Sequence, residues 1–248
     1  MSTERLLSFE GARNFRDLGG YPTKDGRRLK WGRLYRAGIL GKFTDADCES
    51  LAALGLRAIC DLRATAERKR GPGEWLQMPN VSYWSQDYVH SVGDLHALMS
   101  SHLATVDEAR AAMMSVYRAL PVEQAPAYRE LFRLLASGEL PLVLNCSAGK
   151  DRTGLGAALV LTALAVPQDI IVEDYLLSNT AFTVPPEHRA TLKCSPEVSE
   201  ILRGADPEFL ATALATIDDA HGSVDTYLRE ILQVTDEMRA RIEAHLLE

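Results

Sequence analysis

Cys146 and Arg152 are the two residues of this chain whose types and spacing most clearly suggest chemistry. Five residues separate them, an apolar run precedes the cysteine, and a long apolar segment follows the arginine. A loop of this length can curl so that its backbone N–H groups face one centre, to which the next helix adds partial positive charge. An oxyanion held there would lie above the sulfur, with two oxygens bound by the guanidinium. This pattern predicts a thiolate that attacks phosphorus.

The remaining loop residues supply the predicted phosphate-binding groups, which are Ser147, Ala148, Gly149, Lys150, Asp151 and Thr153. We predict that Cys146 forms a phosphocysteine and that Arg152 stabilises the charge of the transition state. Thr153 is expected to hydrogen-bond the sulfur when it departs, and Lys150 to add positive charge to the loop.

Other interpretations of this segment fit less well. A cysteine kept only for packing has no need of the glycine and basic residues that follow Cys146. A nucleotide-binding P-loop requires Gly where the chain has Leu144, and Ser or Thr where it has Asp151. A rhodanese-type transferase needs no basic extension of the loop. A thiol reductase needs a resolving cysteine, for which Cys194 is a distant candidate.

Short apolar runs alternate with helical patterns along the chain. The predicted strands are residues 56–62, 81–85 and 140–145, and the predicted helices include one capped by Thr44, 126–137 and 153–165. This alternation predicts an α/β fold with a central, mostly parallel sheet flanked by helices on both faces. In such a sheet a ligand binds at the carboxyl ends of the strands, where Cys146 emerges.

The mechanism also requires an acid that protonates the leaving group and later activates water. Asp61 is our first choice, because it ends a predicted strand at the same edge of the sheet. Asp151 and Asp87 are the other candidates. The alternative for Asp61 is an ion pair with Arg63 or Arg16 that has no chemical role.

Residues 146–154 resemble the signature loop of cysteine-dependent protein tyrosine phosphatases, in which Cys, five residues, Arg and Ser or Thr follow one another. The string Ala-Gly-Lys-Asp-Arg-Thr-Gly resembles the bacterial PtpB-type (LipA-like) atypical subgroup. Further segments resemble motifs of that subgroup, namely residues 14–21, 34–38, 61–63 with Glu67, 174–179 and 218–228. The resemblance spans most of the chain and implies one tyrosine phosphatase domain over residues 1–248.

The resemblance also implies a range of activities and features. Members of the subgroup act on phosphotyrosine, and some act on phosphoserine, phosphothreonine or phosphoinositides. The resemblance favours Asp61 as the acid, implies no metal or other cofactor, and implies a helical lid insertion at residues 88–124. Helical spacing of apolar residues in that insertion is equally typical of a helix that packs in the core. Lysine at position 150 resembles phosphatases that accept inositol phosphates.

Asn145 departs from the family, whose members usually have His immediately before the nucleophile. An amide can hydrogen-bond the loop backbone but cannot carry a positive charge. One interpretation is a tolerated exchange. The other is a phosphate-binding pseudophosphatase with weakened catalysis, because less of the thiol would be ionised at neutral pH.

The composition is that of one globular enzyme domain, with 46% hydrophobic and 25% charged residues in 248. A net charge of −7 argues against nucleic acid and anionic membrane surfaces as default partners. The resemblance implies phosphorylated proteins or phosphoinositides as substrates. The longest apolar run, residues 155–166, is too short to span a bilayer. The N-terminal residues lack the pattern of a signal peptide, and the four cysteines lack metal-ligand spacing. These features favour the cytoplasm, with signal-independent export as an open alternative; the oligomeric state is not predicted.

Overall fold

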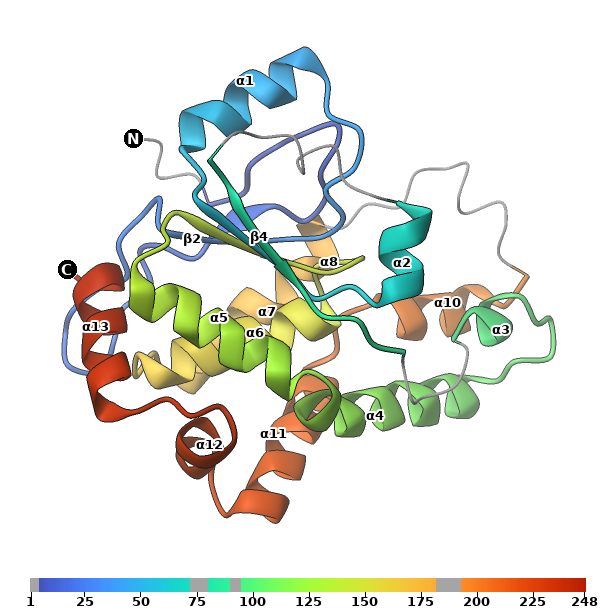
Figure 1. Ribbon diagram of the computed structural model, residues 1–248. Helices are drawn as coiled ribbons and strands as arrows, with labels where there is room; N and C mark the ends of the chain where they lie inside the picture. The colour runs from blue at the N-terminus through green and yellow to red at the C-terminus, as the bar shows by residue number, and fades with distance from the viewer. Residues whose placement is uncertain (1–4, 72–79, 90–94, 182–192) are drawn as a thin grey trace.

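A five-stranded sheet forms the centre of the computed structural model, which describes residues 5–71, 80–89, 95–181 and 193–248 (Figure 1). Its strands are β1 (Arg16–Asp17), β2 (Leu34–Ala37), β3 (Ala58–Asp61), β4 (Ser82–Ser85) and β5 (Leu142–Asn145). Their order in the sheet is β1-β2-β5-β3-β4. All neighbouring pairs are parallel except β1 and β2, which are antiparallel. The predicted α/β fold with a mostly parallel sheet is confirmed.

The three strands predicted from apolar runs are present as β3, β4 and β5, each shorter than predicted. Strand β2 was not predicted. It is buried along its whole length, so the alternation that marks a half-exposed strand is absent, and Tyr35 and Arg36 interrupt the apolar run. Its central position between β1 and β5 therefore follows from tertiary packing.

Most of the helices cover one face of the sheet and form the larger core (Figure 1). They are α4 (Val106–Glu123), α5 (Ala125–Ser137), α6 (Asp151–Ala163), α7 (Gln168–Leu176), α10 (Pro196–Arg203), α11 (Pro207–His221), α12 (Val224–Thr226), the π-helix η2 (Tyr227–Ile231) and α13 (Asp236–Leu246), while the short α8 (Ser178–Ala181) follows α7. Helix α6 is buried on nearly all sides, as its apolar sequence predicts. It therefore holds the end of β5 firmly against the core.

The opposite face of the sheet is covered by α1 (Asp45–Leu54) and the N-terminal segment, which form a second core cluster. The Thr44 hydroxyl accepts the backbone N–H of Asp47, whose carboxylate accepts the N–H of Thr44 in return. Gly55 ends the helix in the left-handed conformation. The helix predicted to be capped by Thr44 is therefore present, and helices lie on both faces of the sheet.

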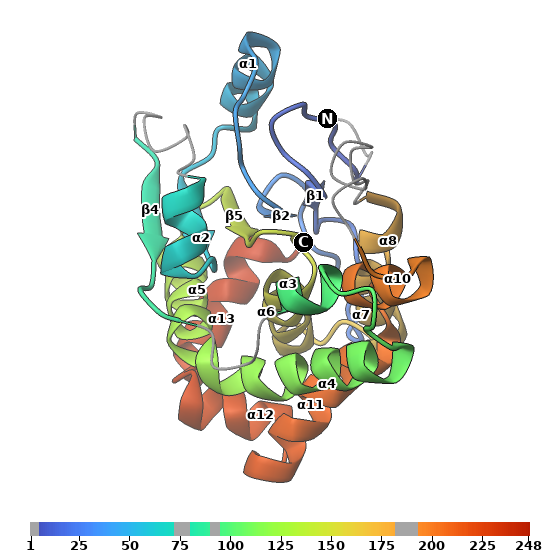
Figure 2. The same ribbon diagram turned by 90° about the vertical axis from the view of Figure 1, so that its right-hand side faces the viewer.

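The carboxyl ends of the parallel strands meet at the side of the molecule that Figure 2 turns toward the viewer. Helix α2 (Thr65–Arg70) directly follows β3 at this side, and α3 (Leu95–Met99) and α10 lie there as well (Figure 2). The predicted helix 153–165 begins two residues earlier, at Asp151, so that Arg152 lies in the first turn of α6. The loop from β5 to α6 thus opens at the edge where ligands of parallel sheets bind.

The segment predicted to hold a lid, residues 88–124, includes residues 90–94, which lie outside the described part of the chain. Helix α4 packs against α10 and α11. Its inner face is buried in the larger core through Ala109, Met113, Tyr117 and Leu120. Helix α4 therefore packs as a core helix, and a lid over bound substrate stays a prediction. None of the helices that the structure describes combines the length and apolar character needed to cross a membrane.

Candidate active site

The loop of residues 146–152, here called the phosphate loop, joins β5 to α6 and surrounds the sulfur of Cys146. Gly149 has a φ of 68°, a conformation that favours glycine. A Cβ added there would lie 2.5 Å from backbone atoms of Ala37 and Gly38, so no larger residue fits. The backbone N–H of Gly149 donates to Cys146 Sγ over 3.2 Å, and the cysteine is buried. An N–H directed at the sulfur is the arrangement that stabilises a thiolate.

Arg152 is held in place by a carboxylate from α2. Glu67 Oε2 lies 2.5 Å from Arg152 Nη1, and Glu67 Oε1 lies 2.9 Å from Nη2. The same Oε1 accepts the hydroxyl of Ser147 at 2.5 Å. The Tyr88 hydroxyl and the carbonyl of Leu62 also contact Nη1. This two-pronged pair fixes the plane of the guanidinium beside the loop.

The electrostatics of Arg152 agree with this geometry. Burial alone would lower the pKa of Arg152, but the bond to Glu67 and the nearby Cys146 sulfur raise it well above its usual value. Arg152 is therefore charged, and its ion pair with Glu67 sets its orientation. Sequence reasoning included Glu67 only as part of a family motif, because its pairing with Arg152 spans 85 positions.

We expect Glu67→Gln to lower kcat/KM for p-nitrophenyl phosphate about tenfold to a hundredfold, less than the loss of a transition-state donor itself. The amide removes the charge that orients the guanidinium while keeping the side-chain shape. Steady-state kinetics would measure the effect. The matched control is Glu130→Gln, because Glu130 also pairs with an arginine through both of its oxygens, binding Nε and Nη2 of the exposed Arg133. Equal kinetics in the two variants would contradict an orienting role for Glu67.

Asp61 lies at the end of β3, level with Asn145 of β5, and its side chain is 0% exposed. Both of its oxygens bind the Arg63 guanidinium, at 2.7 to 3.0 Å. They also accept the Tyr83 hydroxyl at 3.1 Å and the Asn145 amide at 3.4 Å. The structure therefore shows the ion pair with Arg63 that the sequence left open, and the role of Asp61 as the acid stays a prediction.

The other two carboxyl candidates differ in their surroundings. The Asp87 side chain is 83% exposed and binds Arg68 and Thr65. The Asp151 side chain is 24% exposed and stands in the first turn of α6, inside the phosphate loop. Its Oδ1 accepts the Tyr117 hydroxyl at 2.6 Å. Asp151 is therefore the candidate that lies both at the loop and within reach of solvent.

Lys150 and Thr153 place their side chains differently from each other. The Lys150 amino group donates to the carbonyls of Leu202 and Gly204, at 3.2 and 2.8 Å, and lies 3.4 Å from Asp151 Oδ1. It therefore joins the loop to the end of α10, and the predicted positive charge toward substrate remains a prediction. The buried Thr153 hydroxyl oxygen has no hydrogen-bond partner among the described residues. Its hydrogen bond to the sulfur stays a prediction.

Asn145 is buried, and the bond of its amide group to Asp61 points it at β3. Its side-chain oxygen has no partner in the described part of the chain. In a parallel sheet neighbouring residues of one strand point to opposite faces, so Asn145 and Leu144 face apart. The residue that replaces the usual His therefore contacts Asp61, at the end of β3.

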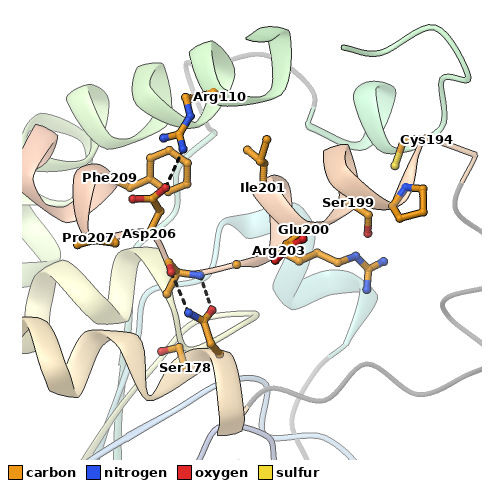
Figure 3. Close-up of a pocket in the computed structure, with 14 residues that line it drawn as sticks. Arg110, Ser178, Cys194, Ser199, Glu200, Ile201, Arg203, Asp206, Pro207 and Phe209 are labelled. Carbon is orange, nitrogen blue, oxygen red and sulfur yellow. Dashed lines mark hydrogen bonds and ion pairs between the residues drawn. The ribbon is translucent and has the colours of Figure 1, made fainter. Parts of the chain in front are cut away.

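A cavity of about 1100 Å³ opens beside the loop, between α10, α8 and the start of α11 (Figure 3). It is lined by none of the predicted site residues, although Gly204, which binds Lys150, is part of its wall. Arg110 lines the cavity and donates to Asp206 (Figure 3). The Asn179 amide group donates to the carbonyl of Ala205 and accepts its N–H. The cavity therefore lies next to the phosphate loop, but the predicted catalytic side chains do not line it.

Comparison with known proteins places this geometry in a family. The profile of the tyrosine phosphatase family matches residues 7–248. The chain belongs to this family. It is 36% identical over 233 residues to a Cupriavidus necator protein that is provisionally named a tyrosine-protein phosphatase, covering 92% of this chain and 84% of that one. It is 34% identical over 261 residues to the triple specificity protein phosphatase PtpB of Mycobacterium tuberculosis, covering 89% of this chain and 91% of that one.

Among solved structures, the crystal structure of P. aeruginosa TpbA overlaps 77% of this chain and 89% of its own. The sequence identity is 18% and the TM-score 0.33. The family membership rests on the sequence relatives, and it confirms the predicted resemblance to PtpB-type phosphatases.

Proposed function

We propose that this chain hydrolyses phosphotyrosine in proteins through a phosphocysteine intermediate, without a metal. The observation that carries the proposal is the phosphate loop, in which the Gly149 N–H bonds the Cys146 sulfur while Glu67 orients Arg152 beside it. A thiolate under an anion site with a fixed guanidinium suits an in-line attack on a phosphate monoester. The cysteine must stay reduced for this chemistry, which fits the cytoplasm as the proposed compartment.

The reaction proceeds in two steps. In the first, the thiolate of Cys146 forms a bond to phosphorus as the bond to the phenolic oxygen breaks, and an acid gives that oxygen its proton. In the second, the same group, now a carboxylate, takes a proton from water while the water oxygen attacks phosphorus. The sulfur leaves as thiolate, with Thr153 as its hydrogen-bond donor, and orthophosphate is released. Arg152 holds two oxygens of the phosphoryl group throughout.

We assign the acid to Asp151 rather than to Asp61. The Asp151 carboxyl stands in the loop and is partly exposed, while the Asp61 carboxylate is buried and fully engaged with Arg63, Tyr83 and Asn145. An acid must come within hydrogen-bond reach of the leaving oxygen. The role left for Asp61 is to hold the ends of β3 and β5 together.

The assignment predicts that the loss in Asp151→Asn depends on the leaving group. For phenyl phosphate, whose phenolate needs a proton, we expect kcat/KM to fall about a hundredfold or more. For p-nitrophenyl phosphate, whose leaving group is stable as an anion, we expect a fall of about tenfold or less. Asp61→Asn serves as the comparison and should lower both values equally. A leaving-group dependence in Asp61→Asn and not in Asp151→Asn would restore Asp61 as the acid.

Two experiments test the proposed function. The first is turnover of p-nitrophenyl phosphate by the natural chain with EDTA present, which we expect to be unaffected by the chelator. The second is acid quenching during turnover, followed by mass spectrometry of the peptide that contains Cys146, which we expect to carry a phosphoryl group. If the natural chain binds phosphate without turning over substrate, and Asn145→His regains turnover, the natural chain is a pseudophosphatase instead. Turnover abolished by EDTA would contradict the metal-independent mechanism.

Substrates beyond phosphotyrosine form the second part of the proposal. The Mycobacterium tuberculosis relative is named a triple specificity phosphatase, which supports more than one class of substrate here. Phosphoserine and phosphothreonine are the further classes that we propose. Phosphoinositides remain a candidate class because of Lys150, although its amino group binds α10 in this structure. Comparing kcat/KM on matched phosphotyrosine and phosphoserine peptides and on a soluble phosphoinositide would decide among them.

A further inference from the structure

A buried polar cluster, formed by Asn14, Arg16, Arg36 and Asp174, lies behind the phosphate loop. The four residues come from the N-terminal segment, β1, β2 and α7, and all are buried. None of them is needed by the two-step reaction as described above. Burying two guanidinium groups is costly, so their presence at this place requires an explanation.

Asp174 holds the cluster together. Its Oδ1 lies 3.1 Å from Arg16 Nε, and its Oδ2 lies 2.5 Å from Arg36 Nη1. Burial would raise the pKa of Asp174, but the charges of Arg16 and Arg36 outweigh it and hold that pKa at about 2. Burial and then Arg36 lower the pKa of Arg16 to about 10, so it still carries its charge at neutral pH. Two cations against one anion leave a net positive charge behind the loop.

The cluster touches the phosphate loop only through carbonyl oxygens. The Asn14 amide group donates to the carbonyls of Ala148 and Gly149, at 3.1 and 2.9 Å. Arg36 Nη2 donates to the carbonyl of Gly149 at 2.8 Å and to that of Lys150 at 3.5 Å. Arg36 therefore uses its two terminal nitrogens for different tasks, one on Asp174 and one on the loop.

The planar geometry of the peptide bond explains how these contacts direct N–H groups toward the sulfur. A trans peptide is planar, so the N–H of one residue points away from the carbonyl of the residue before it. Because the Ala148 carbonyl is held outward by Asn14, the Gly149 N–H points inward, and it is found 3.2 Å from Cys146 Sγ. The same relation directs the N–H groups of Lys150 and Asp151 inward, because Arg36 holds the carbonyls of Gly149 and Lys150.

Other charged or titratable groups also surround the sulfur. Arg152 with Glu67 and the pair Lys150 and Asp151 belong to the loop region, and each pair brings opposite charges together. Tyr128 of α5 is held neutral, since burial raises its pKa well above its usual value. The excess positive charge next to the loop thus comes from the buried cluster.

We propose that Asn14 and Arg36, held in place by Arg16 and Asp174, are positioning residues for the reaction of Cys146: they turn the loop carbonyls outward and aim the loop N–H groups at the sulfur and the phosphoryl oxygens, while the net positive charge of Arg16, Arg36 and Asp174 favours the thiolate. This inference rests on the proposed function for its role in turnover, but its effect on the sulfur exists without turnover.

The test is the rate at which iodoacetamide alkylates Cys146, followed by mass spectrometry of its peptide across a range of pH. The deciding variant is Asn14→Gly, because Asn14 has a φ of 53°, which glycine adopts without strain, and because no buried charge is removed. The matched control is Asn80→Gly, since Asn80 has a φ of 66° and lies exposed before β4. A second variant, Arg36→Lys, keeps the charge but loses one of the two contacts.

In Asn14→Gly we expect the pH of half-maximal alkylation to rise by about one unit, corresponding to an about tenfold loss of thiolate stabilisation. We also expect kcat to fall about tenfold with little change in KM, because the loop amides act on the charge that forms in the transition state. In Arg36→Lys the pH of half-maximal alkylation should also rise and kcat should also fall. In Asn80→Gly neither quantity should change.

If folded Asn14→Gly has the same alkylation curve and the same kcat as the natural chain, the inference is overturned. The role of the cluster would then be purely structural. If Arg36→Lys fails to fold, Asn14→Gly decides alone. Failure of the proposed function gives a different result: the natural chain would show no turnover, while its alkylation curve would still shift in Asn14→Gly.

Discussion

Replacing Cys146 by serine is expected to abolish turnover of p-nitrophenyl phosphate, by a factor on the order of 10⁴ to 10⁶. The hydroxyl that takes the place of the thiol does not ionise at neutral pH, so the Gly149 N–H has no anionic nucleophile to stabilise. The shape of the loop is set by Gly149 and by its outward carbonyls, which the substitution leaves unchanged. Binding of inorganic phosphate or vanadate, measured by calorimetry, should therefore persist in Cys146→Ser.

The control for this variant is Cys194→Ser. Cys194 is a half-buried free thiol in the wall of the cavity beside α10, and it is the distant candidate for a resolving cysteine. We expect the variant Cys194→Ser to turn over p-nitrophenyl phosphate at the rate of the natural chain. Loss of activity in Cys194→Ser to the same extent as in Cys146→Ser would contradict the phosphatase mechanism and favour a thiol reductase.

Replacing Asp174 by alanine is expected to lower the free energy of unfolding by about 3 to 5 kcal/mol, because it leaves two guanidinium groups buried without their counter-ion. Asp174 accepts from the buried Arg16 and Arg36 and from the hydroxyl of the half-buried Tyr21. Denaturation by urea, followed by circular dichroism, would measure the change.

The matched control is Asp225→Ala. Asp225 also binds two arginines, Arg229 at 2.9 Å and Arg239 at 2.6 Å, but its side chain is 52% exposed. We expect a loss of about 1 kcal/mol or less for this variant, as for other surface ion pairs. Equal losses for the two aspartates would contradict the importance of burial in the Asp174 cluster.

The effect of Asp174 should also depend on pH with a defined sign. Its pKa is about 2 in the folded protein against 3.8 as the ordinary value, so the folded state favours the ionised form. The stabilisation is therefore complete above about pH 4 and is lost as the pH falls through about 2. The difference in unfolding free energy between the natural chain and Asp174→Asn should shrink over this window, and an unchanged difference at pH 2 would contradict the ionised pair.

Features that depend on neighbours in the chain were predictable from the sequence. The strand before Cys146, the glycine in the loop and the apolar helix after it follow one another within 24 residues, from Leu140 to Ala163. Local backbone preference and periodicity therefore define this unit without knowledge of the rest of the fold. The mostly parallel sheet follows from the same alternation of strands and helices.

The partners of the charged side chains were decided by the tertiary structure. Asp61 ends its strand as predicted, but the hydrogen bonds that it accepts from Tyr83 of β4 and Asn145 of β5 depend on how the strands are arranged in the sheet. Lys150 lies in the predicted loop, yet its amino group donates to carbonyls at the end of α10, more than fifty positions away. A charged side chain is long and has several rotamers, so its direction depends on which polar groups the fold brings within reach.

The sequence by itself thus determined which nucleophile the protein presents and on which kind of loop, because those depend on consecutive residues. Only the tertiary structure decided what supports that loop. Asn14 meets Gly149 across 135 positions and Arg36 meets it across 113, through strands that lie side by side only after the sheet has formed. The spacing of residues along a chain carries no record of such contacts, because the order of strands in a parallel sheet differs from their order in the sequence.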